Sequence, residues 1–99
     1  MKPIVLKLAR DDLQEIRERL SEFGVNPTKR FRDSFEKLCV QAENMPYTYS
    51  RYGPSPEYRR AVHEYDYLVF YQVEEGSGRV KIYRVLHRKR DVELLIKLE

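Results

Sequence analysis

Two apolar runs joined by a glycine-containing turn decide the fold of this chain, and both lie in YLVFYQVEEGSGRVKIYRVLH (residues 67–87). The runs YLVFYQVEE and RVKIYRVLH are rich in Val, Ile, Phe and Tyr, the side chains that strands favour. The turn between them contains two glycines, which adopt the backbone angles of hairpin turns without a steric cost. The stretch therefore predicts an antiparallel hairpin.

Two shorter runs predict further strands of the same sheet. RRAVHEY (59–65) precedes the hairpin and is also β-rich. PIVLKL (3–8) is β-branched at two positions and roughly alternating, and a proline is tolerated at the start of a strand, so we expect an edge strand there. The segment NMPYTYSRYGPSPEY (44–58) carries three prolines and a glycine and predicts a loop or irregular crossover.

Two amphipathic helices lie between the first strand and this loop. In ARDDLQEIRERLSEFG (9–24) acidic residues crowd the first turn and Gly24 supplies the stop. A second helix is predicted from Asn26 as its cap and Pro27 as its first residue. The apolar stripes have helical spacing; they comprise Leu13, Ile16, Leu20 and Phe23 in the first helix and Phe31, Phe35, Leu38 and Ala42 in the second. The pattern predicts a helical hairpin.

The order of elements defines a fold class. The last segment, RDVELLIKLE (90–99), predicts a short helix with Asp91 near its cap and Val92, Leu95 and Ile96 on one side. The order is then strand, helix, helix, three strands and a short helix. We expect a single α+β domain over residues 1–99, with a small antiparallel sheet and the helical hairpin packed on one of its faces.

Composition excludes several classes of protein. Of the 99 residues 41% are hydrophobic and 35% are charged, which is too apolar for a disordered chain. No run approaches the ~18 apolar residues of a membrane span, and the N-terminus does not resemble a signal peptide. A single cysteine, Cys39, excludes an internal disulfide and favours a reducing cytoplasm. One cysteine and two histidines give no metal site, and we expect no cofactor.

Charge is segregated along the chain, although the net charge is only +3. The stretch RVKIYRVLHRKR (79–90) is strongly basic and contains no acid. Much of the negative charge lies instead in the first predicted helix, between Asp11 and Glu22. This asymmetry predicts a polyanionic partner near the C-terminus.

The sequence resembles the RelE/ParE superfamily of toxins from type II toxin–antitoxin systems, which includes plasmid stabilisation proteins. ARDDLQEIRERL (9–20) is similar to the opening helix of that family. YRRAVHEYDYLVFYQVEEGSGRVKIYRVLHRKRD (58–91) resembles its signature of an arginine strand, an aromatic strand, a turn, and a strand ending in V-L-H before basic residues and Asp. The resemblance covers about the whole chain. It implies a cognate antitoxin that folds over the basic surface.

Members of the superfamily act in different ways: RelE-like toxins cleave mRNA on the ribosome, and ParE-like toxins poison DNA gyrase. A metal-free ribonuclease needs an acid, a base and fixed positive charge. The candidates are His87, because histidine suits proton transfer near neutral pH, and Arg60 and Arg84, because guanidinium groups bind phosphate bidentately. Tyr83 or Tyr71 would stack on a base.

Strand alternation bears on this group of residues. Two sets of side chains are expected on opposite faces: Val80, Ile82, Arg84 and Leu86 on one, and Lys81, Tyr83, Val85 and His87 on the other. Arg84 and His87 then point in opposite directions, unless a bulge or the end of the strand brings them together.

The residues after His87 favour the ParE side of the superfamily. RelE-like nucleases generally place a catalytic tyrosine or histidine near the C-terminus, and RKRDVELLIKLE (88–99) contains neither. His63 would still complete an acid–base pair, although we interpret it as an exposed strand residue. His87 also has a structural interpretation, as a group that bonds to the backbone where the strand ends.

Three hypotheses follow: a ParE-like toxin directed at gyrase, which we prefer slightly; a RelE-like mRNA endoribonuclease acting on the ribosome; and a non-toxic remnant that only binds its antitoxin. None of them involves a membrane. The residues expected to contact the target or the antitoxin are Arg59, Arg60, Tyr83, Arg84, His87, Arg88 and Arg90.

Overall fold

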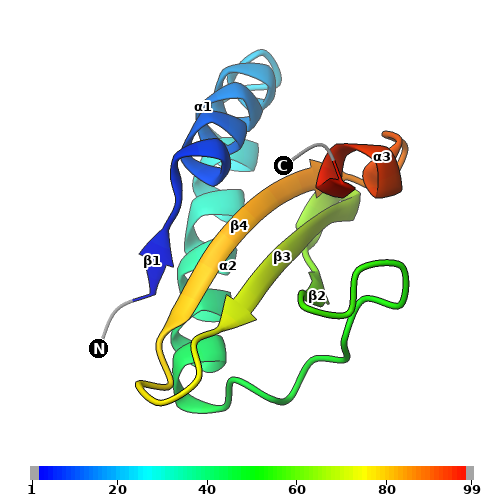
Figure 1. The fold of residues 1–99 in the computed structure, drawn as a ribbon. Coiled ribbons are helices and arrows are strands. Elements are labelled where there is room, and N and C mark those ends of the chain that lie inside the picture. The colour runs from blue at the N-terminus through cyan, green and yellow to red at the C-terminus, as the bar shows by residue number, and fades with distance from the viewer. Residues whose placement is uncertain (1–2, 98–99) are drawn as a thin grey trace.

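The computed structural model describes residues 3–97, and its elements follow the predicted order (Figure 1). They are β1 (Ile4–Val5), α1 (Lys7–Ser21), α2 (Val25–Asn44), β2 (Arg59–Val62), the 3-10 turn η1 (Glu64–Asp66), β3 (Tyr67–Val73), β4 (Val80–His87) and α3 (Val92–Lys97).

The strands form a four-stranded sheet in the order β1-β4-β3-β2, with the predicted β3–β4 hairpin at its centre. β2 and β4 run antiparallel to β3, but β1 runs parallel to β4. The predicted α+β fold is confirmed, and the sheet is mixed rather than wholly antiparallel. The parallel pairing is possible because the helices between β1 and the later strands carry the chain back along the sheet.

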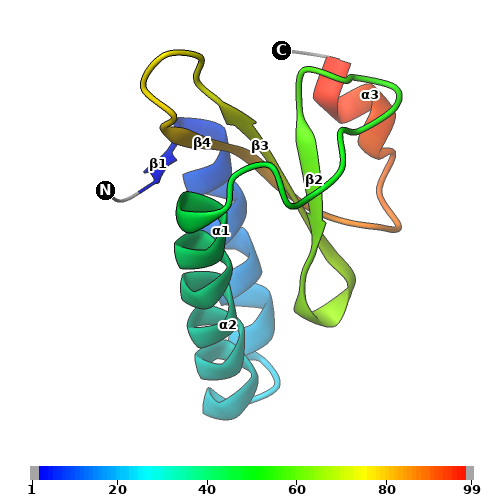
Figure 2. The same cartoon turned by 90° about the horizontal axis from the view of Figure 1, so that it is seen from below.

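Both faces of the sheet are covered. The helical hairpin of α1 and α2 lies on one face, as predicted, and packs on Val69, Tyr71 and Ile82. Figure 2 shows α3 and the segment between α2 and β2 on the other side of β3 and β4. There Phe70 and Leu86 pack against side chains of α3 and that segment. Burial on both faces explains why the strand sequences are nearly continuous apolar runs.

The ends of the first elements differ from the prediction. β1 is two residues long because α1 already begins at Lys7. α2 begins at Val25 with Gly24 at its N-cap, so Asn26 lies inside the helix and is not the cap. Gly24 has a φ of 109°, a left-handed angle that glycine accepts and that lets the chain reverse between the helices. Phe23, expected in the apolar stripe, is 72% exposed at this reversal.

A β-bulge in β4 changes which side chains share a face. Phe70 pairs with Arg84 but Tyr71 pairs with Ile82, so Tyr83 is an extra residue without a partner on β3. Val85 therefore packs with Ile82 on the helical face. The predicted alternation holds as far as Tyr83, which lies opposite Ile82, and is wrong from Arg84 onward. The pairing is regular again from Arg84 to His87, so these two residues still leave β4 on opposite sides.

Candidate functional site

A buried carboxylate on α1 organises the end of the last strand. Asp12 is 7% exposed, and it accepts hydrogen bonds from Nε (2.8 Å) and Nη2 (3.0 Å) of Arg84. It also accepts the backbone N–H of Val85 at 2.9 Å. β1 pairs with β4 only as far as Ile82, so Asp12 supplies an acceptor on an edge of β4 that no strand covers.

These hydrogen bonds define what Arg84 does in the folded chain. Its side chain is 11% exposed and binds the carboxylate as a two-pronged fork, the geometry in which guanidinium pairs are strongest. Removing one partner of such a buried pair costs about 3–5 kcal/mol, because the other charge is left uncompensated. Arg84 thus joins α1 to β4, and the same donors do not face a free phosphate site.

His87 lies at the end of β4, on the face covered by the helices. Its ring packs edge-on against Tyr67, with centroids 5.1 Å apart. Nδ1 accepts the backbone N–H of Lys89 at 3.2 Å, and the carbonyl oxygen accepts the N–H of Arg90 at 3.0 Å. With Nδ1 as the acceptor, the neutral ring carries its proton on Nε2. His87 therefore bonds to the backbone where the strand ends, the structural role that the sequence suggested for it.

A groove of about 370 Å³ runs between α1 and the end of β4, and His87 is among its lining residues. Its charged lining residues are Asp12, Glu15 and Arg19 of α1 and Arg90 of the turn after β4. Glu15 and Arg19 form an exposed pair one turn apart, at 3.9 Å. Asp12, Glu15 and Arg19 were not among the predicted site residues. Of the three, only Asp12 could have been predicted to be buried, because it lies at helical spacing between the buried residues Ala9 and Ile16.

The basic residues after β4 form a fixed, exposed turn, which we call the basic rim (Arg88, Lys89 and Arg90). All three side chains are exposed. The turn is held by the two hydrogen bonds to His87 and by a third, from the N–H of Arg88 to the carbonyl oxygen of Asp66 at 2.9 Å. The side chains of Arg88 and Asp66 approach only to 3.9 Å, and both are more than half exposed. The rim thus presents clustered positive charge on an ordered backbone.

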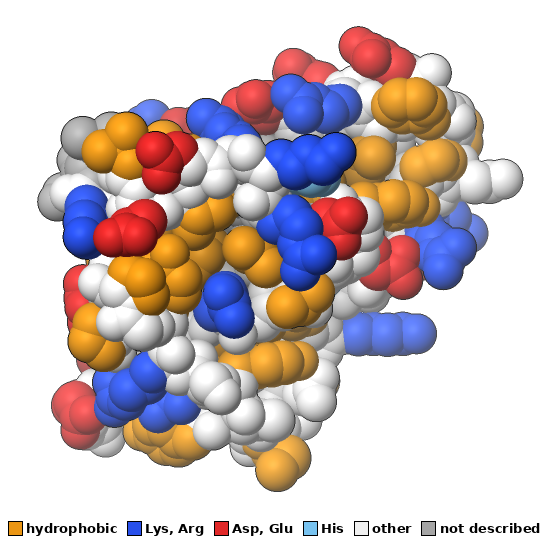
Figure 3. Space-filling model, turned by 90° about the vertical axis from the view of Figure 1, so that its right-hand side faces the viewer, with side chains coloured by type: hydrophobic (Ala, Val, Ile, Leu, Met, Phe, Trp, Pro, Cys, Tyr) orange, Lys and Arg blue, Asp and Glu red, His pale blue; other side chains and the backbone are white. Residues whose placement is uncertain are grey.

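Arg59 and Arg60 lie on β2, the strand at the opposite edge of the sheet from β1. Nη1 of Arg59 donates to the carbonyl oxygen of Tyr49 at 2.7 Å, and its guanidinium lies 5.0 Å from the centre of the Tyr47 ring. Arg60 is exposed, with its guanidinium 5.7 Å from the centre of the Tyr52 ring. Figure 3 shows the side of the molecule with β2, where Lys and Arg side chains are interleaved with apolar and acidic ones.

Both tyrosines considered for base stacking are buried. Tyr83 is 7% exposed, stacks on Tyr58 at 4.4 Å and donates from its hydroxyl to the carbonyl oxygen of Ile96 at 3.3 Å. Tyr71 faces the helices and donates to the carbonyl oxygen of Pro46 at 2.8 Å. Burial raises the pKa of Tyr71 to about 12. In this conformation neither ring is open to a nucleic-acid base.

His63 is not the exposed strand residue that the sequence suggested. It is 7% exposed, and its ring packs edge-on against Phe31 of α2 with centroids 4.6 Å apart. The chain turns into η1 directly after β2, which directs His63 towards α2 and away from solvent. His63 and His87 therefore do not face a common open site.

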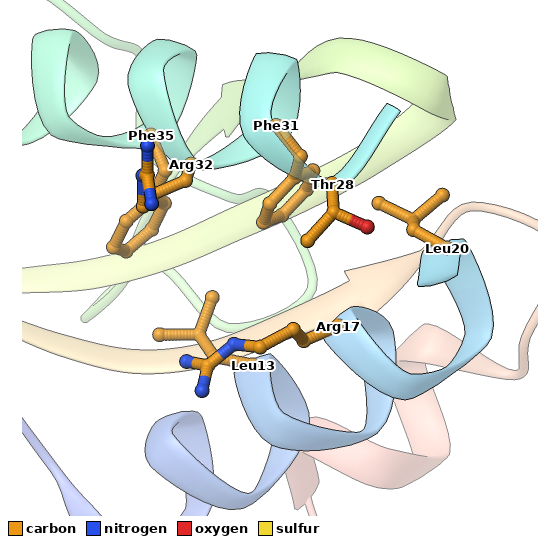
Figure 4. Close-up of a pocket in the computed structure, with 7 residues that line it drawn as sticks. All are labelled: Leu13, Arg17, Leu20, Thr28, Phe31, Arg32 and Phe35. Atoms are coloured by element: carbon orange, nitrogen blue, oxygen red, sulfur yellow. The ribbon is translucent and has the colours of Figure 1, made fainter. Parts of the chain in front are cut away.

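A second groove, of about 390 Å³, lies between α1 and α2 (Figure 4). Its apolar lining residues are Leu13 and Leu20 of α1 and Phe31 and Phe35 of α2, with Thr28 beside them. In Figure 4 the guanidinium groups of Arg17 and Arg32 lie on the two sides of this groove. The groove is a largely apolar surface with cations at its margin.

Three further properties concern residues 3–97. No group of three or more His, Cys, Asp or Glu side chains in this range is arranged to hold a metal ion. None of its helices has the length and apolar character needed to cross a membrane. Cys39 is a free thiol whose pKa is raised to about 11 by burial, with smaller contributions from Glu36 and Glu43, so it is a poor nucleophile.

A four-stranded sheet with a helical hairpin on one face and a basic turn after its last strand is the architecture expected for the RelE/ParE superfamily. Residues 4–92 match the family described as the ParE toxin of type II toxin–antitoxin system, parDE. The chain belongs to this family, and its membership implies a cognate antitoxin as a partner. No curated protein matches the chain.

Proposed function

We propose that this toxin is ParE-like in action: it inhibits growth by binding DNA gyrase through the basic rim, and it is not a nuclease. We infer gyrase as the target from the resemblance to ParE. We infer the basic rim as the binding surface from the arrangement of the basic residues. Clustered charge on an ordered turn suits recognition of an acidic protein surface, since little conformational entropy is lost on binding.

The separation of the candidate nuclease residues is the observation that carries the proposal. The guanidinium of Arg84 is bound to Asp12 at 2.8 and 3.0 Å. His87 packs on Tyr67 on the helical face, whereas Arg60 lies two strands away over the ring of Tyr52. An acid–base group must be within hydrogen-bond reach of the atoms it serves, and these three groups do not converge on one phosphate.

A RelE-like endoribonuclease is the second candidate, and one observation favours it. His87 lines the groove between α1 and β4 together with Arg19 and Arg90. Two guanidinium groups beside an imidazole are the kinds of group that phosphate-ester cleavage requires. In a nuclease site of this kind, Arg19 and Arg90 would bind the phosphate in place of Arg60 and Arg84.

The deciding experiment is induced expression of the chain, followed by measurement of growth and of RNA 5′ ends across the transcriptome. A parallel assay measures DNA supercoiling by purified gyrase with the toxin added. Growth arrest without new RNA ends, together with inhibited supercoiling, supports the proposal. New 5′ ends phased to codons would show a ribosome-dependent nuclease. The absence of growth arrest would favour the non-toxic remnant.

A further inference from the structure

His63 is a buried titratable side chain that the proposed function does not use. Its ring lies against two phenyl rings of α2, with centroid distances of 4.6 Å to Phe31 and 5.9 Å to Phe35. Both ring nitrogens are buried, and neither has a hydrogen-bond partner of good geometry among the described residues. A polar group in this state is costly and needs an explanation.

The charged groups around His63 do not compensate for a positive ring. On η1, Glu64 is the nearest acid, but its carboxylate pairs with Arg30 of α2 at 2.9 Å. Beside Glu64 and Arg30, a surface pocket is also lined by the charged side chains Lys29, Asp33 and Lys37 of α2, but His63 does not line it. From β3, the carbonyl oxygen of Tyr67 accepts the backbone N–H of His63 at 2.7 Å, and the ring of Tyr67 packs on Phe31.

Burial is the main cause of a lowered pKa for His63. The nearby backbone of Ser34 and the charge and backbone of Glu64 favour the protonated ring, but they do not outweigh burial. The neutral ring is therefore the form that fits this site.

The segment next to His63 is strained and touches the basic rim. Tyr65 and Asp66 have φ values of 59° and 64°, left-handed angles that cost side-chain-bearing residues free energy. Such angles persist only where the surroundings impose them. The carbonyl oxygen of Asp66 accepts the N–H of Arg88 at 2.9 Å, so the strained turn holds the first residue of the rim.

We propose that His63 is a pH-sensitive latch: the neutral ring holds residues 63–66 on α2, and protonation releases them together with the contact that fixes Arg88. The release of residues 63–66 is independent of what the toxin binds. We expect this release to weaken growth inhibition, and this consequence rests on the proposed role of the rim. When the backbone of the rim is mobile, its positive charges are no longer held in a fixed arrangement.

The sign of the pH dependence follows from linkage. In the unfolded chain His63 protonates near pH 6.5, whereas in the folded chain its pKa is lower. Between these two pKa values the unfolded state binds more protons, so stability falls as the pH falls below 6.5. The folding equilibrium constant decreases by at most about tenfold for each pH unit in this window.

The direct test is an NMR titration of the full-length chain, labelled with ¹⁵N, from pH 8 to pH 5. The ring signals of His63 are assigned by their loss in His63→Phe. We expect a His63 midpoint below 6.5, with the amide signals of Asp66 and Arg88 shifting at the same midpoint in the wild-type chain and not in the variant. A midpoint at or above 6.5 overturns the proposal, as does an Arg88 amide that does not respond to His63.

Urea denaturation at pH 7.5 and pH 5.5 gives an independent measurement. We expect the wild-type chain and His87→Ala, which retains His63, to lose up to about tenfold in the folding constant on acidification. His63→Phe should lose much less, and an equal loss in this variant contradicts the latch. Should His63→Phe fail to fold, the titration of His87→Ala decides, because His63 is then the single histidine and its ring signals are assigned directly. The first test measures protonation and the second measures folding, and neither measures growth arrest, so their failure is distinguishable from failure of the proposed function.

Discussion

Asp12 of α1 and Arg84 of β4, 72 positions apart in the sequence, form a buried two-pronged ion pair with contacts of 2.8 and 3.0 Å. The same carboxylate accepts the N–H of Val85 at 2.9 Å, which ties the first helix to the backbone of the last strand. Three residues after Arg84, His87 begins the turn that forms the basic rim. The position of the rim thus depends on a contact made by a residue near the start of the chain.

Replacing the acid of this pair should be severely destabilising. We expect Asp12→Asn to lower the free energy of unfolding by about 3–5 kcal/mol, because Arg84 is left buried without a counter-charge. Urea denaturation at pH 7 measures the effect. The matched control is Asp11→Asn, which removes an exposed pair with Lys7 at 3.1 Å and should cost less than about 1 kcal/mol. Equal losses in the two variants would contradict a structural role for Asp12.

The pair can also be removed as a unit. Asp12→Leu with Arg84→Met replaces two buried charges by apolar side chains, so the double variant should be more stable than Asp12→Leu alone. Part of the loss should remain, since the N–H of Val85 no longer has its acceptor. A double variant less stable than the single one would show that Arg84 has a second buried partner.

Tyr71 should make the fold sensitive to alkaline pH. The unfolded chain ionises this phenol near pH 10, but burial raises its pKa to about 12 in the folded chain. Between these values the folded state binds more protons, so stability is lost as the pH rises. We expect Tyr71→Phe to reduce this alkaline loss, at a cost of about 1 kcal/mol at pH 7 for the hydrogen bond to Pro46. Melting curves of the wild-type chain and Tyr71→Phe from pH 8 to pH 11 test it, and an equal alkaline loss in the two chains would contradict it.

His87 distinguishes the two candidate activities. If the chain acts by binding gyrase, His87→Ala should retain most of the growth arrest and lose about 1 kcal/mol of stability, since the N–H of Lys89 loses its acceptor. If the chain is a nuclease with His87 as acid or base, cleavage should fall by roughly 10²–10⁴-fold. Growth arrest at matched expression and RNA 5′-end mapping measure the two outcomes. Arrest abolished in a folded His87→Ala would count against the gyrase proposal.

The helices and the central hairpin could be predicted because local signals specify them. Phe31, Leu38 and Ala42 recur at helical spacing and all are buried. The glycine-containing turn between β3 and β4 makes the predicted reversal, with Gly76 and Gly78 at positive φ. Asp91 accepts the N–H of Leu94 at 3.3 Å and begins α3 as expected.

The site was harder to predict because its contacts are non-local. No local pattern marks Tyr83 as the bulged residue, and the bulge moves Val85 to the helical face. The pairing of Asp12 with Arg84 depends on where α1 crosses the edge of β4, which only the folded chain defines. His63 was expected to be exposed because an alternating strand was extended through it, whereas the strand ends at Val62.

Charge reversal on the basic rim tests the proposed function most directly. We expect Arg88→Glu with Arg90→Glu to abolish growth arrest and gyrase inhibition, because an acidic target surface would now be repelled. The melting temperature should change little, since both side chains are exposed and the pair of Arg88 with Asp66 is long, at 3.9 Å between exposed groups.

The control for this variant must carry the same change in net charge at another place. Arg10 of α1 and Lys37 of α2 are exposed cations outside the rim, so Arg10→Glu with Lys37→Glu is the matched pair. We expect the control to retain growth arrest, because its altered charges lie on the helices and the rim is unchanged. Growth assays at matched protein levels, with melting temperatures for both variants, separate the effect of position from that of net charge. If the rim variant is as toxic as the wild-type chain, the target is not bound through Arg88 and Arg90.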